Sequence, residues 1–199
     1  QLGVDFLALS GHKMLAPMGI GALYGKRELL ESMPPFLTGG EMIETVSRYD
    51  AVYAELPHKF EAGTVNAGGA VGLAAAIDYL ESYGMDTLHQ AEEALTAYVW
   101  KGMQAIPHVH VLGSDRPENH TGIISFTVDQ VHPHDISEII SSDGIDIRAG
   151  HHCAQPLHDY LGIHSSARAS LMFYNTKEEA DRFLESVSNI RSRMGFGNE

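Results

Sequence analysis

Two short runs near the start of the chain alternate apolar with polar or small residues. Residues 4–10 (VDFLALS) and 19–25 (GIGALYG) follow this period of two and are bounded by glycines, which predicts two β-strands. The GHKMLAPM segment between them predicts a loop that holds a lysine in a buried setting. A short helix is expected at 27–32, whereas 33–68 shows no sustained period and predicts a long irregular segment.

Helical spacing replaces this pattern in the middle of the chain. A face of small residues predicts one helix over 69–84. Apolar residues at three- and four-residue spacing predict a second helix over 86–106, with Asp86 as its N-cap. The change of pattern indicates two domains, residues 1–85 and 86–199.

The rest of the chain interleaves strand and helix patterns. Strands are expected at 108–112, 122–128, 145–150 and 167–174, and helices at 133–142 and 176–193. The first two strands are expected to pair, and Thr176 with Glu179 forms a capping box that opens the last helix. Such interleaving predicts a small two-layer α/β domain.

The composition indicates a globular protein and argues against nucleic acid or membrane partners. Apolar residues make up 44% of the chain and charged residues 20%, which is typical of a globular protein. The formal net charge of −13 repels phosphate backbones and anionic lipid, so neither a nucleic acid nor a membrane is expected as a partner. A single cysteine excludes an intramolecular disulfide and suits a reducing compartment, which favours a cytoplasmic location.

That cysteine, Cys153, lies in the segment RAGHHCAQP. Arg148, His151 and His152 make its surroundings electropositive, which favours the nucleophilic thiolate. A buried, unreactive thiol is the alternative, although the polar and glycine-rich neighbours indicate a loop. A zinc site through His151, His152 and Cys153 is less favoured, because adjacent residues rarely reach one tetrahedral ion together.

A lysine follows the first predicted strand in the segment Ser10-Gly11-His12-Lys13. An amine that is desolvated in such a turn can form a Schiff base with an aldehyde. Ser10 and His12 lie close enough in sequence to bind an anion beside it. A surface lysine on a turn remains the alternative.

Two further segments could either bind a ligand or have an ordinary structural role. Arg168 interrupts an apolar run and could pair with a carboxylate, or form an ordinary surface ion pair. Thr64 lies in FEAGTVN, ahead of a predicted helix start, where a glycine and a hydroxyl suit phosphate binding or simple helix capping.

Taken in order, these segments resemble one family. SGHK, GIGALYGK, GGEMI, FEAGTVN, RAGHHCAQP and RASLMFYNT are similar to the class V, fold-type I group of pyridoxal-phosphate (PLP) enzymes, and within it to SufS-type cysteine desulfurases. The compact, histidine-rich cysteine loop fits this branch better than the longer, serine-rich loop of NifS/IscS-type enzymes. The resemblance implies an α/β fold, in which 1–85 is the C-terminal part of the PLP-binding large domain and 86–199 is the small C-terminal domain.

The resemblance also implies roles for the residues in the cofactor half of the site. Lys13 would form a Schiff base with PLP and then transfer protons. Ser10 and His12 would bind the cofactor phosphate, and Thr64 would reach the phosphate of the PLP in the neighbouring subunit of a homodimer.

The remaining implied roles concern sulfur transfer. Arg168 would bind the carboxylate of L-cysteine, and Cys153 would take its sulfur as a persulfide and leave L-alanine. Arg148 and His152 would support the loop, and no metal is involved. The persulfide would pass to a SufE- or SufU-type acceptor for iron–sulfur cluster assembly.

One departure from the family pattern concerns the cofactor bed. The family places a histidine and a DGAQ-like aspartate upstream of the lysine strand, but only twelve residues precede Lys13, and Asp5 does not substitute. We therefore expect a fragment, beginning at Gln1 inside a fold, that is inactive or nearly so alone. A selenocysteine lyase, another class V lyase or transferase, and a non-catalytic thiol or zinc-binding module are the alternatives.

Overall fold

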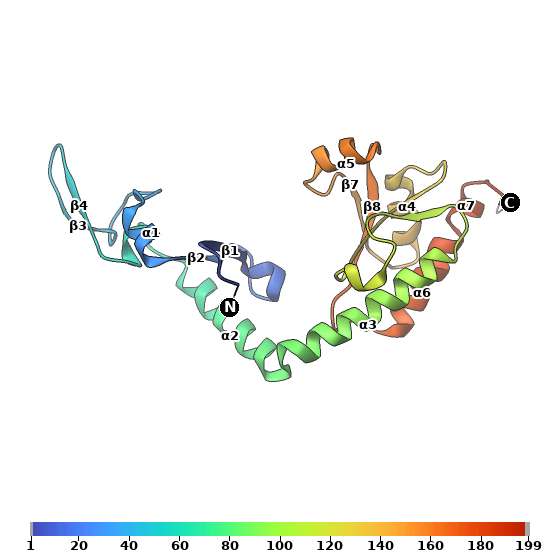
Figure 1. The fold of residues 1–199 in the computed structure, drawn as a ribbon, viewed down its shortest axis with the longest axis horizontal. Coiled ribbons are helices and arrows are strands. Elements are labelled where there is room, and N and C mark those ends of the chain that lie inside the picture. The colour runs from blue at the N-terminus through green and yellow to red at the C-terminus, as the bar shows by residue number, and fades with distance from the viewer. Residues whose placement is uncertain (1, 198–199) are drawn as a thin grey trace. The chain divides into compact units, whose positions relative to one another are not determined.

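The computed structural model describes residues 2–197 (Figure 1). The chain divides after Tyr83 into two compact units, called unit 1 and unit 2 below. Within the described residues, no helix combines the length and the apolar character that a membrane span requires.

Unit 1 opens with an antiparallel hairpin. Strand β1 (Phe6–Ser10) pairs with β2 (Gly21–Gly25), and a short 3₁₀ helix, η1 (Gly11–Met14), follows β1. A Cβ atom on Gly21 would lie 2.4 Å from the carbonyl oxygen of Leu9, so the close approach of the two strands requires glycine there. Both predicted strands are confirmed, as is helix α1 (Arg27–Ser32).

The segment expected to be irregular contains a second hairpin, which corrects the prediction for 33–68. Strands β3 (Ile43–Val46) and β4 (Ala51–Tyr53) are antiparallel, and a 3₁₀ turn, η2 (His58–Phe60), follows them. The turn is closed by Ser47, whose backbone N–H donates to the carbonyl oxygen of Asp50 at 2.7 Å. Strands of three and four residues with a register shift are too short to show a period, which is why the pattern missed them.

Helix α2 (Ala67–Tyr83) completes unit 1. Asn66 caps it, because the side-chain Oδ1 accepts a hydrogen bond from the backbone N–H of Gly69 at 2.9 Å. Gly72 packs so closely on Pro17 that a Cβ atom would lie 2.6 Å from the proline ring. The helix is therefore fixed against the loop that follows η1.

Unit 2 is an antiparallel sheet with helices on one face, which confirms the predicted α/β class. Its strands in spatial order are β5 (Val109–Val111), β6 (Ile123–Val128), β8 (Ser166–Ser170) and β7 (Arg148–Gly150). The helices are α3 (Met85–Gln104), α4 (Pro133–Ser142), α5 (Gln155–Leu161), α6 (Lys177–Ser188) and α7 (Ile190–Arg193), with a 3₁₀ turn η3 (Pro117–Asn119) between β5 and β6. The expected pairing of the first two strands is confirmed.

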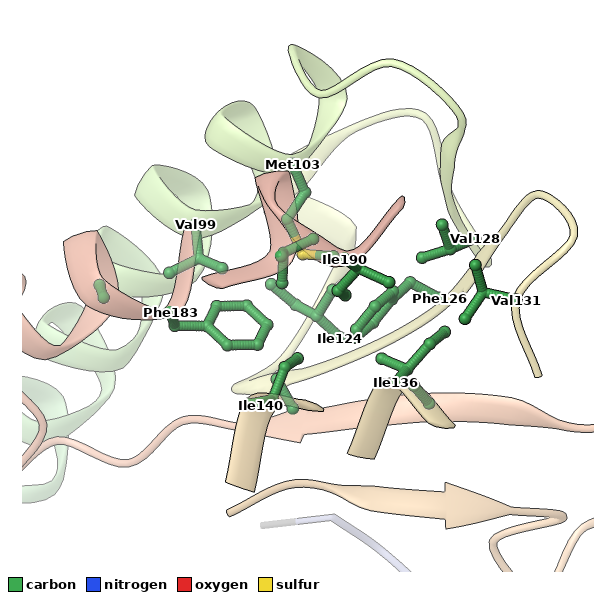
Figure 2. Close-up of a cluster of buried hydrophobic side chains, with 14 residues drawn as sticks. Val99, Met103, Ile124, Phe126, Val128, Val131, Ile136, Ile140, Phe183 and Ile190 are labelled. Atoms are coloured by element: carbon green, nitrogen blue, oxygen red, sulfur yellow. The ribbon is translucent and has the colours of Figure 1, made fainter. Parts of the chain in front are cut away.

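The core of unit 2 lies between the sheet and these helices (Figure 2). Alternate residues of β6 point into it, and Phe126 meets Phe183 of α6 edge to face, with ring centroids 6.2 Å apart. The other large buried side chains come from α3, α4, α6, α7 and the loop after β6, and α5 contributes none: Val99, Met103, Val131, Ile136, Ile140, Val187 and Ile190. The opposite face of β6 and β8 is mostly polar and carries Ser125, Thr127, Ser166, Arg168 and Ser170, with Ile123 as the exception.

Several element boundaries in unit 2 differ from the predictions. Helix α3 begins at Met85 with Gly84 as N-cap, so Asp86 is not the cap but lies in the first turn, where its charge favours the helix dipole. Strand β7 covers only 148–150, and β8 ends at Ser170 because the chain then turns, with the side chain of Asn175 accepting from the N–H of Met172.

The end of the chain is partly as expected. The capping box of Thr176 and Glu179 is confirmed, with both reciprocal hydrogen bonds present. The expected single helix is divided at Asn189 into α6 and α7, and α5 was not predicted at all. Its seven residues with proline in the first turn are too few to show a helical period.

Substitutions at a buried and an exposed position of β6 should lower the free energy of unfolding by different amounts. Phe126 is 0% exposed and Ile123 is 49% exposed on the same strand. We expect Phe126→Ala to lower the free energy of unfolding by about 3–5 kcal/mol, because it loses burial and leaves a cavity. Ile123→Ala should cost roughly 0.5 kcal/mol or less. Denaturant unfolding of both variants measures the difference, and equal losses would contradict the assigned strand faces.

Candidate active site

The cysteine loop runs from the end of β7 to the start of α5. Cys153 is exposed and lies in the left-handed region of backbone space at φ 61°, as does His152 at φ 52°. Residues with a Cβ atom disfavour this region by about 1–2 kcal/mol each, so the surrounding structure must hold the loop. One local bond does so directly, because the N–H of Ala154 donates to the carbonyl oxygen of His151 at 2.8 Å.

Ser166, the first residue of β8, binds histidine rings on both sides of the cysteine. The Nε2–H of His152 donates to its carbonyl oxygen at 2.9 Å, and the Nε2 of His158 lies 3.0 Å from its Oγ. His158 is on α5 and is buried, and its Nδ1 lies 3.1 Å from the carbonyl oxygen of Ala154. The cysteine loop is therefore tied to the central part of the sheet.

Sequence reasoning named His152 but missed Ser166 and His158. The available signal was weak: His158 falls four residues after Ala154, the spacing that places side chain and carbonyl one helical turn apart. Nothing in the sequence indicates that its ring reaches a serine eight residues further on.

Two arginines share the polar face of the sheet. Arg148 of β7 and Arg168 of β8 are directly opposite each other in the register, and Ser125 of β6 is the next residue in the row. Like charges that face each other across strands repel unless an anion joins them. The Nε of Arg168 is buried and has no hydrogen-bond partner among the described residues, so this donor is left unsatisfied.

The same surroundings act on His152. Burial lowers the pKa of its imidazole below the ordinary value of 6.5, and the positive charges of Arg168 and Arg148 and the nearby His158 lower it further. The hydrogen bond to Ser166 opposes these effects only in part. The neutral form of His152 is therefore favoured. Its proton is on Nε2, because the carbonyl oxygen of Ser166 can only accept a hydrogen bond.

A zinc site finds no support in the arrangement of these rings. Within residues 2–197, no three His, Cys, Asp or Glu side chains are placed to share a metal ion. The ring of His151 instead lies edge to face against those of His158 and His164, at centroid distances of 5.8 and 5.7 Å.

The lysine segment lies in unit 1. Ser10 ends β1, and His12 and Lys13 are in η1, with all three side chains exposed. The buried setting expected for Lys13 is therefore wrong for this structure, because η1 buries Gly11 against Ile20 and leaves the next two side chains outside. An amine, an imidazole and a hydroxyl within four residues nevertheless form a donor set that fits an aldehyde cofactor carrying a phosphate.

Asn66, two residues after Thr64, is bonded to the loop between η1 and β2. The Nδ2 of Asn66 donates to the carbonyl oxygen of Gly19 at 3.1 Å, while its Oδ1 caps α2. The capping role considered for Thr64 thus belongs to Asn66, and Thr64 itself is exposed. Asn66 is a residue that sequence reasoning did not single out.

The structure thus gathers the predicted residues into two groups. Ser10, His12, Lys13 and Thr64 belong to unit 1, and Arg148, His152, Cys153 and Arg168 belong to unit 2. Within unit 2, both arginines and the residue that anchors His152 lie on one sheet face.

Comparison with known proteins identifies the family that the sequence matches. Residues 1–183 match the family model described as aminotransferase class-V. A probable cysteine desulfurase from Staphylococcus aureus (strain COL) is 47% identical over 196 residues, which are 98% of this chain and 47% of the relative. The chain therefore spans about half the length of the curated relatives it matches.

Solved structures show the same fold. The cysteine desulfurase CsdA from Escherichia coli, in its S-sulfonic acid form, matches with a TM-score of 0.90 and 36% identity over 96% of this chain and 47% of that one. A C-DES variant with glycine covalently linked to its PLP cofactor matches with a TM-score of 0.79 and 26% identity, over 94% of this chain and 46% of that one.

The lowered pKa of His152 predicts that the folded state loses stability at acidic pH. His152 has a higher pKa in the unfolded chain than in the folded chain, so the unfolded chain takes up the proton at a higher pH. The free energy of unfolding should therefore fall as the pH drops from about 6.5 towards the lower pKa of the folded state. NMR correlation of the imidazole nitrogens should show a titration midpoint for His152 below that of the peptide GHHCAQ. His152→Gln should flatten the acid dependence of thermal unfolding. A midpoint equal to the peptide value would exclude the burial argument.

Proposed function

The chain belongs to the class-V aminotransferase family, and from this we propose that the protein to which it contributes is a PLP-dependent cysteine desulfurase of the SufS type. The observation that carries the proposal is one sheet face on which two arginines, one with an unsatisfied donor, adjoin the loop of an exposed cysteine. The similarity to named cysteine desulfurases supports the same reaction.

PLP is the cofactor of this proposal, and the donor set of unit 1 would hold it. Lys13 would attach it through Nζ, while Ser10 and His12 would bind its phosphate. Thr64 would reach the phosphate of the cofactor bound by the second subunit of a homodimer. When bound, PLP supplies an electron sink for cleavage of bonds next to the substrate amine.

Arg168 would select the substrate. Its planar guanidinium pairs with a carboxylate through two parallel hydrogen bonds, and the unpartnered Nε is one of the donors. Arg148, opposite it in the register, would add positive charge to the same position and support the loop. L-cysteine bound by its carboxylate in this way is the proposed substrate.

Cys153 would then accept the sulfur. Its thiolate attacks the sulfur of the substrate, so that an S–S bond forms as the bond between that sulfur and the substrate Cβ breaks. The electron pair of the broken bond stays with the carbon skeleton, and a proton delivered from Lys13 Nζ completes L-alanine. His152, neutral and bonded to Ser166, would support the loop during this step.

The product persulfide would leave through a protein partner. Cys153 is exposed, so a SufE- or SufU-type acceptor could take its outer sulfur for iron–sulfur cluster assembly. We place this chemistry in the cytoplasm, where thiols stay reduced. The 199-residue chain alone is proposed to be inactive or nearly so, because the family's ring-binding aspartate and histidine precede the lysine strand.

Replacing the cysteine tests the proposal. In the complete protein loaded with PLP, Cys153→Ala should reduce L-alanine formation from L-cysteine by at least about 100-fold, since the sulfur acceptor is gone. Tyr160→Ala, 86% exposed on α5, is the matched control and should leave the rate unchanged. The 199-residue chain should give the background rate in the same assay.

Two results would overturn this assignment. One is full alanine formation from L-cysteine by Cys153→Ala. The other is turnover of selenocysteine, but not of cysteine, by the unaltered protein, which would favour a selenocysteine lyase.

Replacing the arginine tests substrate binding. Arg168→Lys keeps the charge but loses the two-point pairing, so we expect KM for L-cysteine to rise roughly tenfold or more. Arg182→Lys on α6 is the control, because Arg182 binds the carbonyl oxygen of Asp143 on the helical side of unit 2. An unchanged KM for Arg168→Lys in steady-state assays would remove this residue from the substrate site.

A further inference from the structure

The cysteine loop holds a backbone conformation that its residues do not prefer. His152 and Cys153 both have positive φ, and Gly150, which begins the loop, has φ 125°. A residue with a Cβ atom stays in this region only where its surroundings prevent relaxation. The bonds that prevent relaxation here converge on Ser166.

Ser166 holds the loop at three points. Its backbone pairs with Gly150 across β7 and β8, at the point where the loop leaves the sheet. Its carbonyl oxygen accepts from His152, immediately before the cysteine, and its Oγ meets Nε2 of His158, five residues after the cysteine. Ser166 is 0% exposed, so none of these bonds competes with water.

His158 links Ser166 to Ala154, the residue that follows the cysteine. The carbonyl oxygen of Ala154 can only accept, so Nδ1 of His158, 3.1 Å away, carries the proton. In the neutral ring Nε2 then has to accept, and the donor 3.0 Å away is the hydroxyl of Ser166. His158 is 5% exposed, and both its nitrogens are used.

We propose that Ser166 and His158 are positioning residues for Cys153. Acting together, they fix His152 on one side of the cysteine and Ala154 on the other, and so present the thiol in one backbone conformation. Neither residue needs to touch the reacting atoms. The inference rests on the proposed function, since positioning affects turnover only if Cys153 is the sulfur acceptor.

The kinetic test uses the complete PLP-loaded protein with Ser166→Ala, His158→Leu and the double variant. We expect kcat for alanine formation to fall roughly tenfold in each single variant, because a buried partner is left unsatisfied and the loop relaxes. KM for L-cysteine and the cofactor absorbance should stay within twofold of the unaltered protein. The double variant should lose no more than the worse single variant, because the hydrogen bond between Ser166 Oγ and His158 Nε2 is already lost in each single variant.

Three further variants separate positioning from general stability. His158→Gln can place an acceptor near the position of Nε2 and should recover most of kcat. Ser170→Ala, exposed at the far end of β8, and Tyr160→Ala, exposed on α5, should leave kcat unchanged. If the unaltered protein turns over but Ser166→Ala and His158→Leu keep full kcat, the proposal is wrong.

A second measurement does not depend on turnover. In the 199-residue chain, the amide of Ala154 is bonded to His151, so its hydrogen exchange reports the closed loop. Ser166→Ala should speed this exchange about tenfold, while the amide of Val187 in the core should change little. Unchanged exchange at Ala154 would overturn the positioning role. Absence of desulfurase activity in the unaltered protein would count against the proposed function alone.

Discussion

The alternation of side chains along β8 is the constraint on which unit 2 depends. Ala167 and Ala169 point into the core, and the period of two therefore turns Ser166 and Arg168 to the opposite face. A slip of one residue in register would bury the guanidinium group and expose the alanines. The packing of the core thus decides where the loop anchor and the free arginine donor lie.

Local signals made much of the fold predictable. A capping box, a proline in the first helical turn and alternating apolar residues are properties of short stretches. They predict the start of the helix at 176–193, the helix at 133–142 and the strands at 4–10 and 19–25, and all of these are present, although the last helix divides at Asn189. The β3–β4 hairpin and α5 were not predictable in this way. They are too short to show a period, and a register shift and bonds to distant residues stabilise them.

The residues of the candidate site also fall into those recognisable from local sequence and those whose roles depend on distant partners. Lys13, Cys153 and Arg168 could be selected from their chemistry and immediate neighbours, because an unusual residue in a polar turn or an apolar run is visible in the sequence. Asn66 and Ser166 could not, since their roles come from partners 47 and 14 residues away. Sequence reasoning therefore selected candidate reactive groups but missed the residues that hold them in place.

The hairpin of unit 1 has a consequence for the behaviour of this chain in solution. Neighbouring residues Phe6 and Leu7 on β1, and Leu23 and Tyr24 on β2, are all exposed, so the ribbon is apolar on both faces. Within the described residues β1 and β2 pair only with each other, which leaves backbone donors and acceptors along the two outer edges. Such a ribbon recruits further strands, so salting-out agents and high protein concentration will favour aggregation of the folded chain.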